Sequence, residues 1–111
     1  MAEDLIDHTT FTELQQTVGA EFVVELVDTF LEEAPQMLAE LRSALAAGAA
    51  EPFRRAAHSL KTNANTFGAL VLGNQARALE QGGLPANIKA LDVLDAIYAE
   101  TTTKLQALAR E

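Results

Sequence analysis

The residue best suited to chemistry in this sequence is His58, which lies within a stretch of helical character. A neutral imidazole has a nitrogen lone pair, and its unperturbed pKa of about 6.5 leaves much of it unprotonated at cellular pH. Such a ring can attack phosphorus without help from a buried base. Lys61, three residues later, can offset negative charge on phosphoryl oxygens. Judged on residue types alone, a solvated surface histidine is the more common alternative.

The helix that carries His58 is predicted to run from Pro52 to about Phe67. At about 100° per residue, its apolar side chains gather on one face around Leu60. His58 falls almost opposite Leu60, so a fold that buries Leu60 must expose His58. The predicted buried face consists of Phe53, Ala56, Ala57, Leu60, Ala64 and Phe67, and the outer face carries Arg54, Arg55, His58, Thr62 and Asn65, with Lys61 at its edge.

The rest of the chain also has helical spacing of its apolar residues, and no strand pattern of useful length occurs. A capping box is predicted at Thr10 and Glu13, where a first short helix begins and then ends at Gly19. Phe22 and Ile88 are assigned to the buried stripes of their helices. The further predicted helices are 20–47, which contains Pro35, 70–81 and 86–109. We therefore expect one domain over residues 1–111, an all-α antiparallel four-helix bundle with a short additional N-terminal helix.

Composition and charge restrict the partners. The net charge of −8 disfavours nucleic acid and anionic membranes as ligands, because phosphate would be repelled. The segment from Pro52 to Arg77 has no acidic residue and carries +4, so the remainder carries −12. We expect an acidic partner or a phosphate group to bind at this segment. Cysteine is absent, which excludes disulfides. No apolar run is long enough to span a membrane and no secretory signal is visible, so we expect a cytoplasmic location.

The local sequence around His58 resembles a known signature. The residues His-Ser-Leu-Lys-Thr-Asn-Ala-Asn-Thr-Phe-Gly-Ala, from His58 to Ala69, are similar to the signature of histidine phosphotransfer domains. Upstream, the segment from Glu25 to Pro35 resembles the second helix of that family. Downstream, Leu79-Glu80 resembles the end of its fourth helix. The resemblance covers nearly the whole chain, from about residue 6 to residue 108.

The resemblance implies a function in a two-component phosphorelay. His58 would carry a phosphoryl group between aspartates of receiver domains, those of response regulators and hybrid sensor kinases, with Lys61 beside the phosphate. The receiver would contribute the magnesium ion, so we expect no cofactor and no metal on this chain, which would be a monomer. The residue after the lysine is often glycine in this family and is Thr62 here, which changes the docking surface. The expected partner-binding residues are Arg54, Arg55, Ser59, Thr62 and Asn65.

Two alternatives stay open at this point. The same bundle could bind a receiver or kinase domain as an adaptor without being phosphorylated, in which case His58 could be replaced without loss. The chain could also be a fragment of a nucleotide-using histidine kinase. It has no glycine-rich nucleotide loop. We therefore expect a phosphocarrier that has no ATP-dependent kinase activity of its own.

Overall fold

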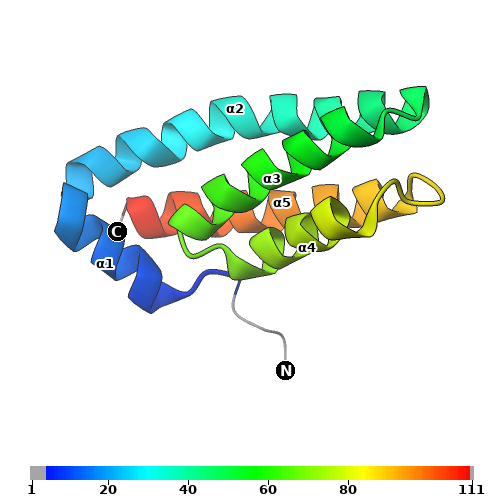
Figure 1. Cartoon of the computed structure of the whole chain (residues 1–111). Coiled ribbons are helices and arrows are strands. Elements are labelled where there is room, and N and C mark those ends of the chain that lie inside the picture. Colours follow the sequence, from blue (N-terminus) through cyan, green and yellow to red (C-terminus); the bar gives the residue numbers. More distant parts are fainter. Residues whose placement is uncertain (1–4, 111) are drawn as a thin grey trace.

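The computed structural model of the chain describes residues 5–110, and these residues form helices joined by short turns (Figure 1). No helix among them is long and apolar enough to cross a membrane. The helices are α1 (His8–Val18), α2 (Ala20–Ala47), α3 (Ala50–Thr66), α4 (Leu70–Gly82) and α5 (Lys89–Ala109).

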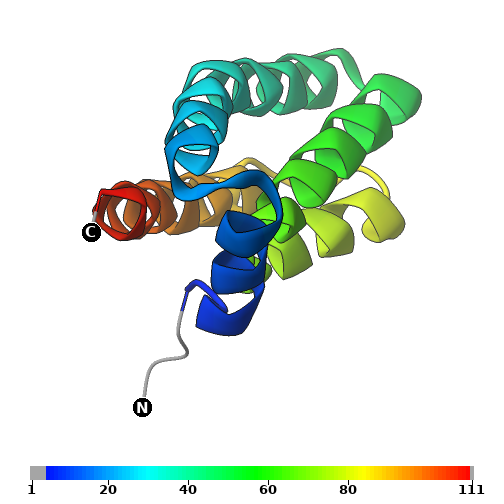
Figure 2. The ribbon, with the colours of Figure 1, turned by 90° about the vertical axis from the view of Figure 1, so that its left-hand side faces the viewer.

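Helices α2, α3, α4 and α5 form the bundle, and α1 lies across one of its ends (Figure 2). The predicted fold class, a four-helix bundle with a short N-terminal helix, is therefore confirmed. Phe30 of α2 packs against aromatic rings from two other parts of the bundle. Its ring centroid lies 5.5 Å from that of Phe67, at the end of α3, and 6.1 Å from that of Tyr98 in α5. The largest fully buried side chains are Ile6, Val23, Val27, Leu41, Phe53, Leu60, Leu72, Leu91, Leu94, Thr101 and Leu105.

Helix α3 buries the face predicted from its sequence. Leu60 at the centre of this face is 0% exposed, and the other five apolar side chains assigned to it are buried as well. The outer face is exposed along its length. The amphipathic pattern therefore fixes how α3 is rotated about its own axis.

The turn between α3 and α4 requires glycine at position 68. Gly68 has a φ of +77°, and a Cβ atom built there would lie 2.7 Å from the carbonyl oxygen of Asp7. The same two residues are also hydrogen-bonded, because the Asp7 N–H donates a 2.7 Å hydrogen bond to the Gly68 carbonyl oxygen. A side chain at Gly68 would be strained and would also displace the N-terminal segment from the turn.

Two predicted helix starts are wrong by two residues. Helix α1 begins at His8 rather than near Thr10, and Asp7 precedes it in an extended conformation. The Thr10 hydroxyl donates a 2.5 Å hydrogen bond to the Asp7 carboxylate, so Thr10 does not form the predicted capping box with Glu13. Helix α3 begins at Ala50, which puts Pro52 at the third helical position. Proline is tolerated there because N–H groups of the first turn have no partner within the helix.

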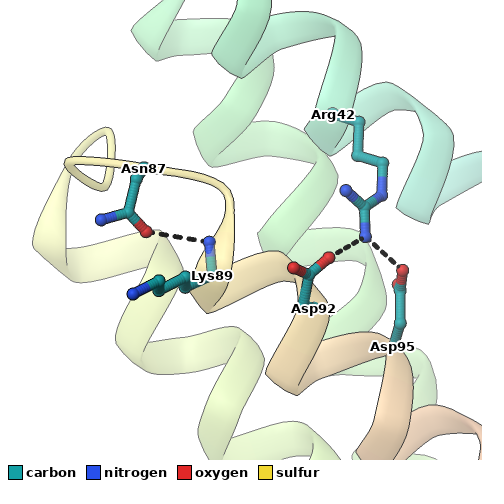
Figure 3. Close-up of polar contacts among 5 residues, drawn as sticks. All are labelled: Arg42, Asn87, Lys89, Asp92 and Asp95. Atoms are coloured by element: carbon teal, nitrogen blue, oxygen red, sulfur yellow. Dashed lines mark hydrogen bonds and ion pairs between the residues drawn. The ribbon is translucent and has the colours of Figure 1, made fainter.

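The start of α5 lies three residues later than the predicted Ala86. The side-chain oxygen of Asn87 accepts a 2.9 Å hydrogen bond from the backbone N–H of Lys89, the first helical residue (Figure 3). Asp92 and Asp95 follow in the next two turns of α5. Arg42 of α2 contacts both of these carboxylates, Asp92 at 2.9 Å and Asp95 at 2.5 Å (Figure 3). These ion pairs join the second half of α2 to the first half of α5.

Two residues assigned to buried stripes are exposed instead. Phe22 near the start of α2 is 47% exposed, and Ile88 just before α5 is 55% exposed. In α2, Val23 and Val27 provide the buried contacts at that end of the helix. Helical periodicity marks an apolar face but does not show how far along the helix a neighbour covers it.

Replacing Leu60 should destabilise the fold far more than replacing its neighbour. Leu60→Ala removes a fully buried side chain and should cost about 2–5 kcal/mol of unfolding free energy. Ser59→Ala, on the exposed side of the same turn, should change it by less than about 0.5 kcal/mol. Chemical denaturation followed by circular dichroism measures both. Equal losses for the two variants would contradict the orientation of α3.

Candidate functional site

His58 lies near the middle of α3 with its side chain 54% exposed. The ring is therefore accessible, as predicted from the burial of Leu60. Lys61, one turn later, is less exposed at 23%. This difference arises because Lys61 lies at the border between the outer face of α3 and the neighbouring helix α4.

A carboxylate from α4 connects these two side chains. Glu80 Oε2 lies 2.8 Å from Nδ1 of His58, and Glu80 Oε1 lies 2.7 Å from Nζ of Lys61. The Glu80 side chain is only 13% exposed, and its Oε1 atom is buried from solvent. The ammonium group of Lys61 thus compensates a negative charge that water cannot reach at that atom.

The surroundings of Glu80 favour its ionised form. The Lys61 ammonium group, and after it the His58 ring, lower the pKa of the carboxyl group below its ordinary value of 4.5, and partial burial opposes them. Glu80 is therefore a carboxylate at neutral pH and can only accept hydrogen bonds.

An ionised Glu80 fixes the tautomer of His58. Because the carboxylate accepts, the short contact at Nδ1 requires a proton on that nitrogen. The neutral ring then has its lone pair on Nε2. The arrangement is a half-exposed imidazole that is oriented from one side and nucleophilic at the other nitrogen.

The two arginines of the outer face are both exposed but differ in their contacts. The Arg54 guanidinium is held by Glu51 one turn earlier, with Nη2 2.5 Å and Nε 2.6 Å from the same carboxylate oxygen. Arg55 lines a groove of about 380 Å³ between α2 and α3, one turn before His58. The residues that line this groove are Met37, Glu40, Pro52, Arg55, Ala56 and Ser59.

The remaining predicted partner-binding residues, Thr62 and Asn65, are exposed as well. Thr62 follows His58 by one turn on the same face of α3. Asn65 differs from Thr62 because its side chain lies against the backbone of Gly73 in α4. The structure therefore brings His58 and Lys61 together through Glu80, and it distributes the other predicted residues along the outer surface of α3.

Among residues 5–110, no group of three or more His, Cys, Asp or Glu side chains gathers in a way that could hold a metal ion. Glu80 is the carboxylate in contact with His58, and both of its oxygens are engaged by side chains of α3.

Sequence reasoning missed Glu80 as a site residue. Its position at the end of a predicted helix gave no indication of its contact, because that contact depends on the alignment of α4 against α3. A signal was nevertheless available, since Glu80 directly follows Leu79, which has helical spacing from the apolar residues Leu72 and Ala76. A short antiparallel connection puts the end of α4 beside the middle of the longer α3.

The fold and this site together match a known family. The family model of the Hpt domain matches residues 25–110, which include α3, α4 and the contacts of His58. The chain therefore belongs to the Hpt family, the histidine phosphotransfer domains of phosphorelays, as the resemblance around His58 predicted.

A solved structure supports the same assignment over a longer range. The chain is similar to histidine-containing phosphotransfer protein B (HptB) of Pseudomonas aeruginosa PAO1, with a TM-score of 0.76 and 26% sequence identity. The alignment covers 98% of this chain and 94% of that protein, so it includes α1 as well. No curated protein sequence gives a significant match.

Removal of Lys61 should raise the pKa of Glu80. Because the folded-state pKa is lowered, Glu80 contributes stability above about pH 4.5 that is lost as the pH falls through its folded-state pKa. In Lys61→Met the titration midpoint of the Glu80 carboxyl carbon, followed by NMR, should move upward. Lys104→Met, which removes an exposed lysine of α5, is the matched control and should leave it unchanged. The same midpoint in both variants would contradict the ion pair.

Proposed function

We propose that this protein is a phosphocarrier in which His58 accepts a phosphoryl group from the aspartyl phosphate of one receiver domain and passes it to the aspartate of another. The observation that carries the proposal is the contact between Glu80 and Nδ1 of His58, which leaves a nucleophilic Nε2 on a half-exposed ring. Membership of the Hpt family supports the same role.

The transfer step needs little chemistry from this chain. The Nε2 lone pair forms a bond to phosphorus while the bond between phosphorus and the aspartate oxygen of the receiver breaks. The bonding electrons leave on the aspartate carboxylate. The proton stays on Nδ1 throughout, and the Glu80 carboxylate stabilises the positive charge that the ring gains. Because no proton has to move, the same contacts serve the reverse step toward a second receiver.

Charge on the phosphoryl oxygens has to be balanced by several groups. Lys61, whose ammonium group is one turn from His58, offers one positive charge to them. The magnesium ion that phosphoryl transfer requires would be held by the receiver. The phosphoryl group should persist once the receiver leaves, because both oxygens of Glu80 are already engaged and do not activate water.

The receiver would dock on the outer face of α3. Exposed residues around His58 supply the contacts, and the groove beside Arg55 and Ser59 extends this surface toward α2. We propose that the protein acts as a cytoplasmic monomer whose contact with the receiver is transient. The proposed partner-binding residues are Arg54, Arg55, Ser59, Thr62 and Asn65.

Transfer of labelled phosphate tests the proposed function. The parent protein should gain label from a phosphorylated receiver in the presence of magnesium, and His58→Gln should gain none, because an amide has no comparable lone pair. Neither protein should gain label from ATP alone. Gel separation of the labelled chains gives the readout.

Two outcomes would overturn the assignment. Label on the glutamine variant would place the phosphoryl group on another residue, and label from ATP alone would indicate kinase activity. A receiver that binds parent and variant equally but labels neither would favour a non-phosphorylated adaptor. Circular dichroism of His58→Gln controls for the fold, which should be retained because His58 is exposed.

The two outer arginines should affect receiver binding in different ways. Arg54→Gln and Arg55→Gln each remove one positive charge, so both should slow association at low salt and reduce its salt dependence. Only Arg55→Gln should also speed dissociation, because Arg54 already donates its hydrogen bonds to Glu51 whereas Arg55 lines the groove. Surface plasmon resonance separates the two rates, with Lys104→Gln as a remote control. Binding that is equal for all variants at every ionic strength would contradict this docking face.

A further inference from the structure

The groove between α2 and α3 has charges of opposite sign on its two walls. Glu40 of α2 lines one wall, and Arg55 of α3 lines the other. Both side chains are exposed, and among residues 5–110 neither forms an ion pair, with the other or with a third residue. The other two cations of α3, by contrast, are each paired with a glutamate. The groove therefore offers one positive and one negative charge to a partner.

The space between these two charges is apolar at its base. Met37, one turn before Glu40, is half-buried, and Ala56, next to Arg55, is 4% exposed. The groove has a volume of about 380 Å³, which is enough for an aliphatic or aromatic side chain. Such a side chain would remove the exposed part of Met37 from water, and burial of apolar surface is favourable by about 25 cal/mol per Å².

The groove lies beside His58, on the side of the ring that faces away from α4. At about 100° per residue, Arg55 and Lys61 lie about 60° to either side of His58 on α3. Lys61 contacts Glu80 of α4, whereas Arg55 lines the groove toward α2. A protein interface of ordinary size covers about 800 Å² of each partner. A receiver that docks on the exposed ring therefore also covers the groove.

We propose that this groove selects the receiver by its charges, an inference that rests on the proposed function. The receiver inserts an apolar side chain between the two walls, with a basic side chain beside Glu40 and an acidic side chain beside Arg55. A receiver that presents an acidic side chain to Glu40 is rejected, because the interface would bring two like charges together. Glu40 is thus a specificity-determining residue, although it lies outside the histidine helix.

The same two charges fix the direction in which the receiver lies. If the inserted segment of the receiver were turned through 180° in the groove, its acidic side chain would meet Glu40 and its basic side chain would meet Arg55. Only one direction is therefore matched in charge. That direction holds the aspartate of the receiver in one position relative to Nε2 of His58, and transfer of the phosphoryl group depends on such positioning.

Binding of a receiver to charge variants of the groove tests this proposal. The variants are Glu40→Gln and Glu40→Lys. The matched controls are Glu25→Gln and Glu25→Lys, because Glu25 is an exposed glutamate of the same helix, about 22 Å from Glu40 along its axis. The probe is an unphosphorylated receiver domain that binds the parent protein. Surface plasmon resonance at low and high salt gives the two rate constants.

The expected result has the opposite sign to that of simple attraction by an acidic partner. If the receiver presented only acidic groups, a lysine at position 40 would strengthen binding. We expect Glu40→Lys to lower the affinity by about tenfold at low salt and Glu40→Gln to lower it by less, with both Glu25 variants within about twofold of the parent. The two lysine variants have the same net charge, so the difference between them reports the local contact. This difference should shrink at high salt.

A further variant tests the apolar part of the groove. Met37→Gln keeps the length of the side chain but makes the base of the groove polar. It should speed dissociation of the receiver and leave the salt dependence of association unchanged, because no charge is altered. Dissociation at the parent rate would show that no apolar side chain enters the groove.

Tighter binding of Glu40→Lys, or equal changes in Glu40→Lys and Glu25→Lys, would overturn the proposal. Binding is measured without phosphate, so it is independent of labelling. A protein whose binding depends on Glu40 but that is never labelled at His58 defeats the proposed function alone. A labelled protein that is indifferent to charge at position 40 defeats the selective groove alone, and a parent protein that binds no receiver defeats both. Circular dichroism controls for the fold, which should be retained because both glutamates are exposed.

Discussion

The site depends on two requirements that α3 meets at once. One side of this helix buries Leu60 in the core, and an adjacent side packs against α4. His58 lies opposite Leu60 but still within reach of a carboxylate on α4. A ring that was turned further toward solvent would lose its orienting contact, and a ring turned toward the core would lose its access to a partner. The half-exposed position of His58 follows from both requirements together.

Carboxylates balance more of the positive charge around His58 than the composition of residues 52–77 indicates. The segment from Pro52 to Arg77 carries +4, but Glu51 and Glu80 lie just outside it and pair with Arg54 and Lys61. Arg55 and Arg77 are the other two cations of the segment, and Arg55 lies one turn before His58 on α3. Because Arg54 and Lys61 are both paired with carboxylates, they offer little free positive charge for holding phosphate. This suits a carrier, which has to release the group as readily as it accepts it.

The features that the sequence predicted correctly are those encoded within a single helix. Gly19 and Gly48 mark both ends of α2, and the apolar residues of α3 determine which face is buried. Contacts between helices were harder to predict from the sequence. The role of Glu80 depends on how α4 is aligned along α3, and Phe22 is exposed because no neighbour covers that part of α2. At the start of α1, the predicted capping box at Thr10 was wrong because the helix begins at His8, directly after Asp7.

The hydrogen bond between Asp7 and Gly68 joins α1 to the turn that connects the histidine helix with the glutamate helix. Helix α1 has a single buried residue, Phe11, so it belongs to the part of the fold with the least local stability. Its detachment would be a partial unfolding event that leaves the bundle intact but releases the turn. Gly68 lies in the turn between the same two helices that Glu80 and His58 join, so loss of α1 would remove a hydrogen bond to this turn. The N-terminal helix, which precedes the matched family region, is thus held against the turn between the two helices that carry the site.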